Sequence, residues 1–444
     1  MAKHILQSLE YLSRNSKLLT LLGLSLVLVG AVRLHYSPTI PSFRLMEIGV
    51  ILAVLPHIPI SRPLAEQKFT SKRIAQVLVG ALVASFLLRS LYNVVSPLPA
   101  GADTATYMFY AAYVAKNLES IPAILFFHTS PYSIYFEPFV WIVFGVLVRI
   151  GFPLEWIPQI LVPLVSTVTI LPFYRLVARF KGTSVALPAA LLLSVAPLQL
   201  RFSLDLFRNV FGNLFMICAF YFILFERRRV PWKSICLVAL LAATYQPSFL
   251  LFLVTIVAYL GFGHPPNGSR RNLLIALIAM IPLGVPAYLG TGGLVVSFLH
   301  SIFANITGLL HGPFDWQRGV RDASFPFSWS FALVCMSIPL LISTRRRDFF
   351  FFYVASVMAL VALFVLGTGY GERWGDFVEF GIAAYAGQQL ATSKKGRGFL
   401  PIAVAWVFFE SVTFIHEFYR PCIECFARYG RLAHDLGLHW PFQD

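Results

Sequence analysis

Residues 96–137 form the first long polar interruption in a chain dominated by apolar segments, and they hold Asp103, His128 and Glu137. A carboxylate at a membrane boundary can act as a general base for an incoming hydroxyl group. Carboxylates and imidazoles also bind divalent cations such as Mg²⁺ or Mn²⁺, although no spacing here has the specificity of a motif such as HExxH. The sequence therefore predicts chemistry in this stretch. Asp103 is the candidate general base, Glu137 or His128 is its supporting or metal-binding partner, and all three are candidate metal ligands.

The residues around Asp103 indicate how its side chain is presented. Pro97 and Pro99 end the preceding helix, and the pattern over 104–117 predicts a short helix lying along the outer surface, with aromatic side chains at 107, 109, 110 and 113 facing lipid or a lid. Asp103 stands at the N-cap position of this helix. The Asp103 carboxylate can cap the helix, act as a general base, or do both in a single orientation.

Composition fixes the class of protein. The 444 residues are 58% hydrophobic and only 12% charged, far below the ~25% charged residues of globular chains. Apolar runs close to the ~20 residues that a membrane-spanning helix needs recur along the chain. They lack the alternation of a membrane barrel. We therefore expect an all-α polytopic membrane protein.

The basic residues predict the orientation in the membrane. We expect about thirteen transmembrane helices, near 18–34, 45–60, 74–92, 157–176, 183–197, 207–225, 232–246, 248–262, 272–290, 328–343, 349–366, 376–391 and 399–417. Lys and Arg gather in alternate loops, near residues 3–17, 62–73, 175–181, 227–233, 270–271, 345–347 and 394–397. The positive-inside rule then gives a cytoplasmic N-terminus and an external C-terminus. Residues 136–151 are also apolar, but a further span there would invert the orientation of every later loop. We therefore expect them to form an interfacial or re-entrant segment. The net charge of +15 is thus a topology signal, and no nucleic-acid partner is expected.

Three regions follow from this scheme. Residues 1–73 form an N-terminal transmembrane hairpin and a basic cytosolic linker, and residues 399–444 form the last transmembrane helix and an external tail. Residues 74–398 form the catalytic module, with external loops over 93–156 and 291–327. Near the end of its first helix, Arg89 can extend towards the outer head groups.

Further charged residues are predicted at the outer boundary. Asp205 and Arg208 stand at the outer mouth of the helix over 207–225, where they can form a structural ion pair or take part in a site. Arg373 lies in a Gly-rich loop, where it can clamp a phosphate or pair with Glu372 or Asp376. Arg318 and Arg321, in the second long external loop, can support phosphate or acceptor binding.

Two of the five cysteines stand close together. Cys422 and Cys425 lie in the external tail, where a local disulfide or two plain thiols is favoured over a zinc site. Cys218, Cys236 and Cys335 fall within apolar helices and are expected to be packing residues.

The layout resembles a known family. The Gly-x-Asp after an early span, the short surface helix, and the Pro- and aromatic-rich run from His128 to Pro138 resemble the first external loop of the C superfamily of glycosyltransferases. Protein O-mannosyltransferases and aminoarabinose transferases are members, and SLDLFRNVFGNLFM looks most like archaeal members. The resemblance covers about residues 85–395. It implies transfer of a sugar from a lipid phosphate, with Asp103 at the reaction centre, Glu137 or Asp205 as a second acidic residue and Arg373 on the lipid phosphate. Protein mannosyltransferases carry Asp-Glu where this chain has Asp-Thr.

We therefore expect a membrane glycosyltransferase, hexosyltransferase- or mannosyltransferase-like, with its active site on the external face of the cell membrane. Its partners are a polyprenyl- or dolichyl-phosphate sugar donor, membrane lipids, and a lipid, glycan or protein acceptor. Asp103 is the general base, and Arg373 and Arg208 bind the donor phosphate. No P-loop or dinucleotide-binding motif supports nucleotide chemistry. The alternative is a transporter or flippase for a lipid-linked or anionic solute, in which intramembrane charges would line the path.

Overall fold

The computed structural model describes residues 71–96, 98–120, 128–129, 132–133, 138–290, 329–343, 347–367, 374–392, 394–418 and 422–442, with short pieces within 21–29 and at 49. The predicted N-terminal hairpin and the loop over 291–327 lie almost entirely outside these residues. The elements are α4 (Ser71–Val95), α5 (Ala102–Lys116), β1 (His128–Thr129), β2 (Tyr132–Ser133), α7 (Pro138–Arg149), η3 (Ile157–Leu161), α8 (Val162–Val168), α9 (Ile170–Lys181), α10 (Thr183–Ser194), α11 (Pro197–Leu204), α12 (Phe207–Phe225), α13 (Trp232–Thr244), α14 (Gln246–Phe262), α15 (Ser269–Gly290), α18 (Phe331–Ser343), α19 (Phe349–Gly367), α21 (Val378–Ala391), α22 (Lys394–Phe418) and α23 (Ile423–Asp435).

Within the described residues, three helical stretches are long and apolar enough to cross a membrane: Lys72–Val95, Ile157–Lys181 and Phe207–Phe225. The bent pair α10 and α11 adds a fourth if it counts as one span, and several shorter apolar helices accompany them. Apart from its two ends, an α-helix satisfies its backbone groups internally, as a lipid environment requires. Large apolar side chains at Val79, Val83, Leu87 and Leu91 recur every fourth residue and are exposed on one face of α4. The fold is mostly helical and is compatible with a helical membrane protein.

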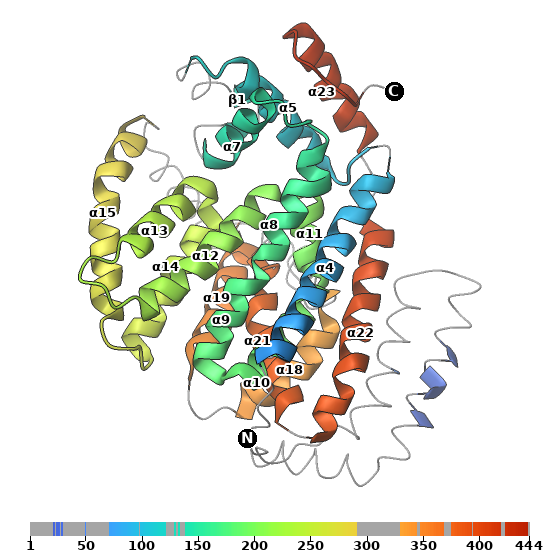
Figure 1. Ribbon diagram of the computed structural model, residues 1–444, viewed down its shortest axis with the longest axis vertical. Helices are drawn as coiled ribbons and strands as arrows, with labels where there is room; N and C mark the ends of the chain where they lie inside the picture. Colours follow the sequence, from blue (N-terminus) through green and yellow to red (C-terminus); the bar gives the residue numbers. More distant parts are fainter. Residues whose placement is uncertain are drawn as a thin grey trace.

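A cap of short elements lies over one end of the long helices (Figure 1). It consists of α5, α7, the two strands and α23, with α7 and α23 both packed against α5. With 12 residues, α7 is shorter than a membrane span. The strands form a two-stranded antiparallel sheet that pairs His128 with Ser133. A two-strand hairpin of this length is too short to leave an alternating pattern in the sequence.

The aromatic residues of α5 face the protein interior. Tyr107, Phe109 and Tyr110 are buried, and Tyr113 is partly buried. The ring of Tyr110 lies 4.8 Å from that of Trp141 on α7, and the ring of Phe109 lies 5.2 Å from that of Tyr429 on α23. The prediction that these rings face lipid or a lid was wrong, because α7 and α23 cover the helix on two sides.

The helix predicted over 183–197 ends three residues early, and a second short helix follows it at an angle. α10 ends at Ser194, α11 begins at Pro197, and the two helices meet at 50°. The carboxylate of Glu379 on α21 accepts the backbone N–H groups of Leu198 and Gln199, at 3.0 and 2.8 Å, and so satisfies two donors in the first turn of α11. The hydroxyl of Ser330 donates to the same carboxylate. Pro197 supplies the N-terminal signal for the new helix.

Arg89 bonds to the end of α10, on the other side of this break. Its guanidinium donates to the carbonyl of Ser194 at 2.7 Å and to the hydroxyl of Ser166 at 3.0 Å, and the side chain is buried. The carbonyl of Val195 accepts from the hydroxyl of Ser411. The prediction that Arg89 extends to the lipid head groups was wrong. The terminal carbonyl of a broken helix needs a donor, and Arg89 provides it.

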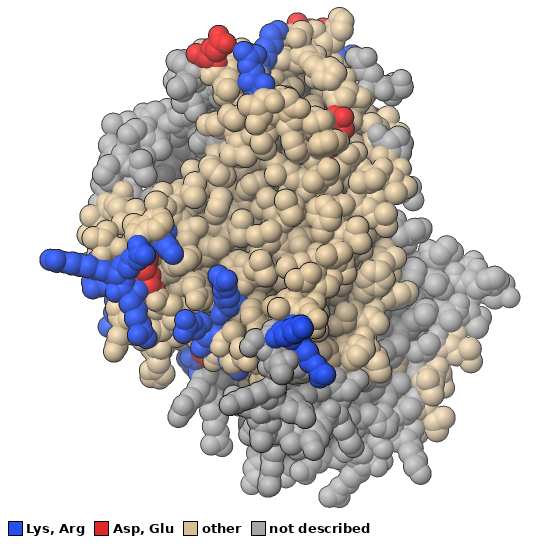
Figure 2. Space-filling view, in the orientation of Figure 1, with Lys and Arg blue, Asp and Glu red and all other residues tan. Residues whose placement is uncertain are grey.

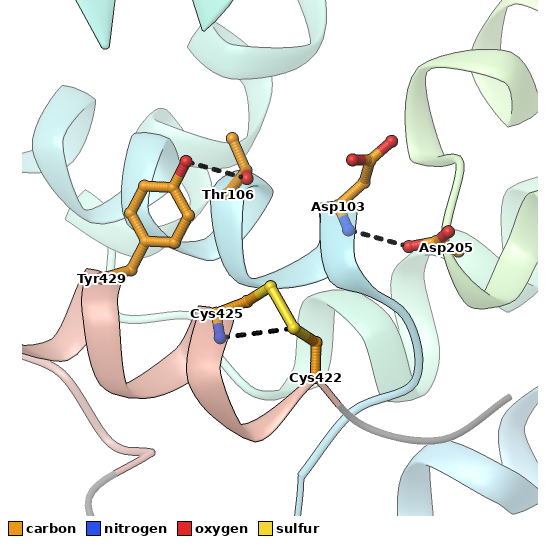
Figure 3. Close-up of a disulfide and its surroundings, with 6 residues drawn as sticks. All are labelled: Asp103, Thr106, Asp205, Cys422, Cys425 and Tyr429. Carbon is orange, nitrogen blue, oxygen red and sulfur yellow. Dashed lines mark hydrogen bonds between the residues drawn. A yellow bond between two sulfur atoms is a disulfide. The ribbon is translucent and has the colours of Figure 1, made fainter. Parts of the chain in front are cut away.

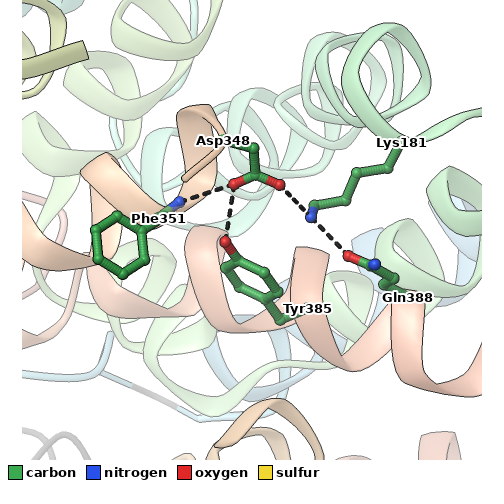
Figure 4. Close-up of polar contacts among 5 residues, drawn as sticks. All are labelled: Lys181, Asp348, Phe351, Tyr385 and Gln388. Atoms are coloured by element: carbon green, nitrogen blue, oxygen red, sulfur yellow. Dashed lines mark hydrogen bonds and ion pairs between the residues drawn. The ribbon is translucent and has the colours of Figure 1, made fainter. Parts of the chain in front are cut away.

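At the opposite end from the cap, Lys181 joins three helices (Figure 4). Its ammonium group pairs with Asp348, donates to Gln388 at 2.6 Å and lies 4.2 Å from the ring centroid of Tyr385. Asp348 also accepts from the Tyr385 hydroxyl at 2.8 Å and from the Phe351 N–H at 3.0 Å. These contacts connect the end of α9 to the start of α19 and to α21.

We predict that Glu379→Ala destabilises the protein by about 3 kcal/mol, because it leaves two buried N–H groups and a buried hydroxyl without their acceptor. Glu379→Gln keeps one acceptor oxygen and should cost less. The measurement is the thermal unfolding midpoint in detergent.

Glu119→Ala is the matched control, because Glu119 is 89% exposed and its ion pair with Arg149 lies at the surface. That variant should unfold close to the parent. Equal midpoints for Glu379→Ala and Glu119→Ala would contradict the role given to Glu379.

Candidate functional site

The candidate site begins at the N-terminus of α5. The N-cap residue is Gly101, and no side chain of the cap residue bonds into the helix. Instead, Oδ1 of Asp205 accepts the backbone N–H of Asp103 at 2.9 Å (Figure 3). Asp205 stands at the C-terminal end of α11, about a hundred residues further along the chain. Asp103 lies in the first helical turn, so the prediction that it occupies the N-cap position was wrong. A carboxylate from another helix performs the capping.

Gly101 makes this contact possible. Its φ of 82° lies in the left-handed region that favours glycine. A Cβ atom at this position would stand 2.0 Å from Oδ1 of Asp205. A second bond, from the hydroxyl of Thr104 to the carbonyl of Leu204 at 3.1 Å, joins the same two segments. The start of α5 is therefore fixed on the end of α11, and two half-buried carboxylates, those of Asp103 and Asp205, lie at the junction.

Arg208 brings a cation to the same place. It lies in the first turn of α12, directly after α11, and its Nε donates to the hydroxyl of Tyr107 at 3.0 Å. Tyr107 is one helical turn after Asp103 on α5, so the two share a face. The guanidinium also lies 5.8 Å from the ring centroid of Trp141 and 5.7 Å from that of Tyr245. Arg208 thus lies among aromatic rings and is itself half-buried.

The electrostatics of Tyr107 reflect these neighbours. Burial raises the pKa of the Tyr107 phenol above its ordinary value, the charge of Arg208 lowers it, and the charge of Asp103 raises it again. The phenol stays protonated at neutral pH as a result. Its oxygen can accept from Arg208 while Tyr107 remains a neutral wall of the site.

The C-terminal tail lies against this helix. Cys422 and Cys425 form a disulfide at the start of α23, as one of the two favoured alternatives predicts. The hydroxyls of Thr106 and Tyr429 are hydrogen-bonded at 3.1 Å, and Lys116 donates to the carbonyl of Leu436 at 2.6 Å. Figure 3 shows the carboxylate of Asp103 pointing away from the disulfide. The tail therefore contacts α5 at Thr106 and Lys116, and its disulfide lies away from that carboxylate.

Sequence reasoning missed one buried ion pair near the site. Arg201 on α11 pairs with Asp376 at 2.9 Å, and the Asp376 side chain is fully buried. Asp376 was considered only as a partner for Arg373. The available signal was the run Arg201 to Arg208, which places three charges in eight otherwise mostly apolar residues. The pair joins α11 to the turn before α21.

The other predicted site residues are only partly covered by the structure. It brings together Asp103, Asp205 and Arg208. Glu137, Arg373, Arg318 and Arg321 lie outside the described residues, and His128 is described only as part of the backbone of β1. No group of three or more His, Cys, Asp or Glu side chains that could hold a metal ion occurs in the described part of the chain. The proposed metal ligands are thus untested, apart from the position of Asp103.

Comparisons with known proteins give one solved structure to report. The crystal structure of the Archaeoglobus fulgidus oligosaccharyltransferase, in complex with zinc and sulfate, matches with a TM-score of 0.44 and 16% sequence identity over 80% of this chain. The chain spans about half the length of that protein, 52%. No protein-family model matches, and a search of curated proteins finds no match either. A TM-score below 0.5 is too low to assign an activity to this chain.

We predict that Gly101→Ala destabilises the protein more than Gly151→Ala does. Both glycines have positive φ, at 82° and 96°, so both variants carry the left-handed backbone cost of about 1–2 kcal/mol. Only at Gly101 would the new Cβ meet another atom, since nothing lies within 4 Å of that position at Gly151. The additional loss should be about 1–3 kcal/mol, measured by thermal unfolding. Equal losses would show that the contact with Asp205 does not constrain α5.

We also predict that Cys422→Ser combined with Cys425→Ser loosens α23 while the long helices stay intact. Closing a four-residue loop stabilises by at most about 2 kcal/mol, and the bond restrains the start of α23. Hydrogen exchange should become faster in α23 and stay unchanged in α12. Cys236→Ser, which replaces an exposed free thiol, is the control. Unchanged exchange in α23 would contradict the prediction.

Proposed function

We propose that this chain is a membrane glycosyltransferase that moves a sugar from a polyprenyl- or dolichyl-phosphate donor to a lipid, glycan or protein acceptor on the external side of the membrane. One observation carries the proposal: Asp103, Asp205 and Arg208 gather where α11 ends and the N-termini of α5 and α12 begin. This arrangement offers carboxylates for proton transfer and positive charge for a phosphate within one half-buried site.

The chemistry follows from these charges. Asp103 takes the proton from the acceptor hydroxyl as the oxygen attacks the anomeric carbon. The bond from that carbon to the phosphate oxygen breaks, and polyprenyl phosphate leaves with an additional negative charge. The guanidinium of Arg208 stabilises this charge with two hydrogen-bond donors in one plane. The N-terminal end of α12 adds partial positive charge beside Arg208.

The remaining predicted residues complete the proposed site. Arg373 joins Arg208 on the donor phosphate, Glu137 is the second catalytic carboxylate, and Arg318 and Arg321 assist from the second external loop. A divalent cation, Mg²⁺ or Mn²⁺, would be held by Asp103 with His128 and Glu137 and would neutralise phosphate charge. Asp205 acts mainly by fixing the backbone of Asp103.

Two features support a site on the external side of a chain with thirteen membrane spans. The disulfide of α23 lies beside α5, and disulfides persist mainly in oxidising compartments outside the cytoplasm. On the face shown in Figure 2, most Lys and Arg lie over the end of the molecule away from the cap, and a few lie on the cap. By the positive-inside rule, that end faces the cytoplasm and the cap faces outwards.

The test uses purified protein in nanodiscs with a panel of labelled polyprenyl-phosphate sugars, and it follows the release of polyprenyl phosphate. Asp103→Asn keeps the size of the side chain and removes the base, so turnover should fall by about 10²- to 10⁴-fold. Asp435→Asn, at a carboxylate that is 74% exposed on α23, should retain full turnover. Equal turnover in Asp103→Asn and the parent would contradict the role of Asp103. No turnover with any donor would favour a transporter or flippase.

A further inference from the structure

A strongly basic platform lies far from the candidate site, at the ends of α12 to α15. Between residues 222 and 272, one carboxylate, Glu226, stands against six cations: Arg227, Arg228, Arg229, Lys233, Arg270 and Arg271. The arginines of this platform are exposed. They account for the dense cluster of basic side chains at the left of Figure 2. The proposed transfer reaction does not use them.

The platform is held in place by hydrogen bonds between its two loops. Arg271 donates to the carbonyl of Arg228 at 2.9 Å, and the amide of Asn272 donates to the carbonyl of Glu226 at 2.8 Å. The hydroxyl of Ser269 donates to the carbonyl of Leu224 at 3.1 Å. The loop before α13 and the start of α15 are therefore one ordered surface, which lowers the entropic cost of binding a ligand there.

The single carboxylate bonds to the protein itself. Oε2 of Glu226 accepts from the backbone N–H of Ser234 at 3.2 Å and from its hydroxyl at 2.9 Å, so it caps the first turn of α13. One carboxylate engaged in this way leaves the platform strongly positive. A phosphate, whose oxygens accept the donors of several arginines at once, is the chemistry that fits.

Apolar side chains at the same place indicate that the phosphate belongs to a lipid. Trp232 is 48% exposed and Phe262 is 81% exposed, both at the basic ends of apolar helices. The guanidinium of Arg228 and the ammonium of Lys233 lie 5.8 and 5.6 Å from the centroid of the Trp232 ring. Tryptophan beside Lys and Arg at the ends of apolar helices is typical of a membrane–water interface.

We propose that this platform is a binding site for the phosphate head groups of anionic phospholipids in the leaflet that it faces. The arginines hold the phosphates while Trp232 and Phe262 enter the boundary between head groups and acyl chains. Bound lipid would fix the α13–α15 part of the molecule in the membrane. The proposal does not depend on the reaction at Asp103.

The experiment titrates phosphatidylglycerol into the intact protein in neutral detergent and follows the thermal unfolding midpoint. Parallel titrations use phosphatidylcholine and inorganic phosphate. Arg227, Arg228 and Arg229 are replaced together by Gln. In the charge-matched control, Gln replaces Arg149, Arg428 and Arg431. These residues lie on α7 and α23, at the other end of the molecule.

Phosphatidylglycerol should raise the midpoint of the parent and of the control, and the platform variant should need at least about tenfold more lipid for the same shift. Added salt should weaken the effect. Equal lipid dependence in the two triple variants would overturn the proposal. A matching shift from inorganic phosphate would assign the platform to free phosphate and overturn the lipid assignment.

A second measurement does not depend on the triple arginine variant. Brominated phosphatidylglycerol should quench the tryptophan fluorescence of the parent more than that of Trp232→Phe, and brominated phosphatidylcholine should show a smaller difference. Equal quenching by the two lipids would contradict selective binding of anionic head groups.

Discussion

The hydrogen bond from the Asp103 backbone N–H to the Asp205 carboxylate is the interaction on which the candidate site depends. It joins residues a hundred positions apart and fixes the first turn of α5 on the end of α11. It also requires glycine at 101, because a Cβ there would occupy the space of the Asp205 carboxylate. With its backbone fixed in this way, Asp103 presents its side chain from a rigid helix start, which is what the proposed role as general base would require.

The position of Asp205 is set by the break between α10 and α11. α10 and α11 meet at 50°, and Asp205 stands at the C-terminal end of α11, where it contacts the start of α5. Glu379 and Arg89 satisfy the groups that the break exposes, and Arg201 joins the new helix to Asp376. These buried charges have hydrogen-bonded partners, which is the condition under which charge is tolerated in an apolar interior. In this account the break is a structural device that delivers Asp205 and Arg208 to α5.

Much of the helical layout could be predicted from the sequence, because long apolar runs can satisfy their backbone only as helices. The helix over Phe207–Phe225 coincides with its predicted range, and α5 begins within two residues of prediction. The stretch around Asp103 was recognisable from its Pro, Gly and carboxylate signals. What could not be predicted were contacts between distant segments. Asp205 as the cap of α5, Arg89 at the helix break and the burial of the α5 aromatics all depend on tertiary packing, which local spacing does not encode.

The most direct measurement of the central claim is a cryo-EM structure of the protein in nanodiscs with a bound polyprenyl phosphate. The account predicts that the phosphate lies against Arg208, on the side of α5 that carries Asp103 and Tyr107, with the isoprenoid chain running down between the long helices. Arg373 should approach the same phosphate. A phosphate bound elsewhere, roughly 10 Å or more from the Asp103 carboxylate, would contradict a transferase site at this position.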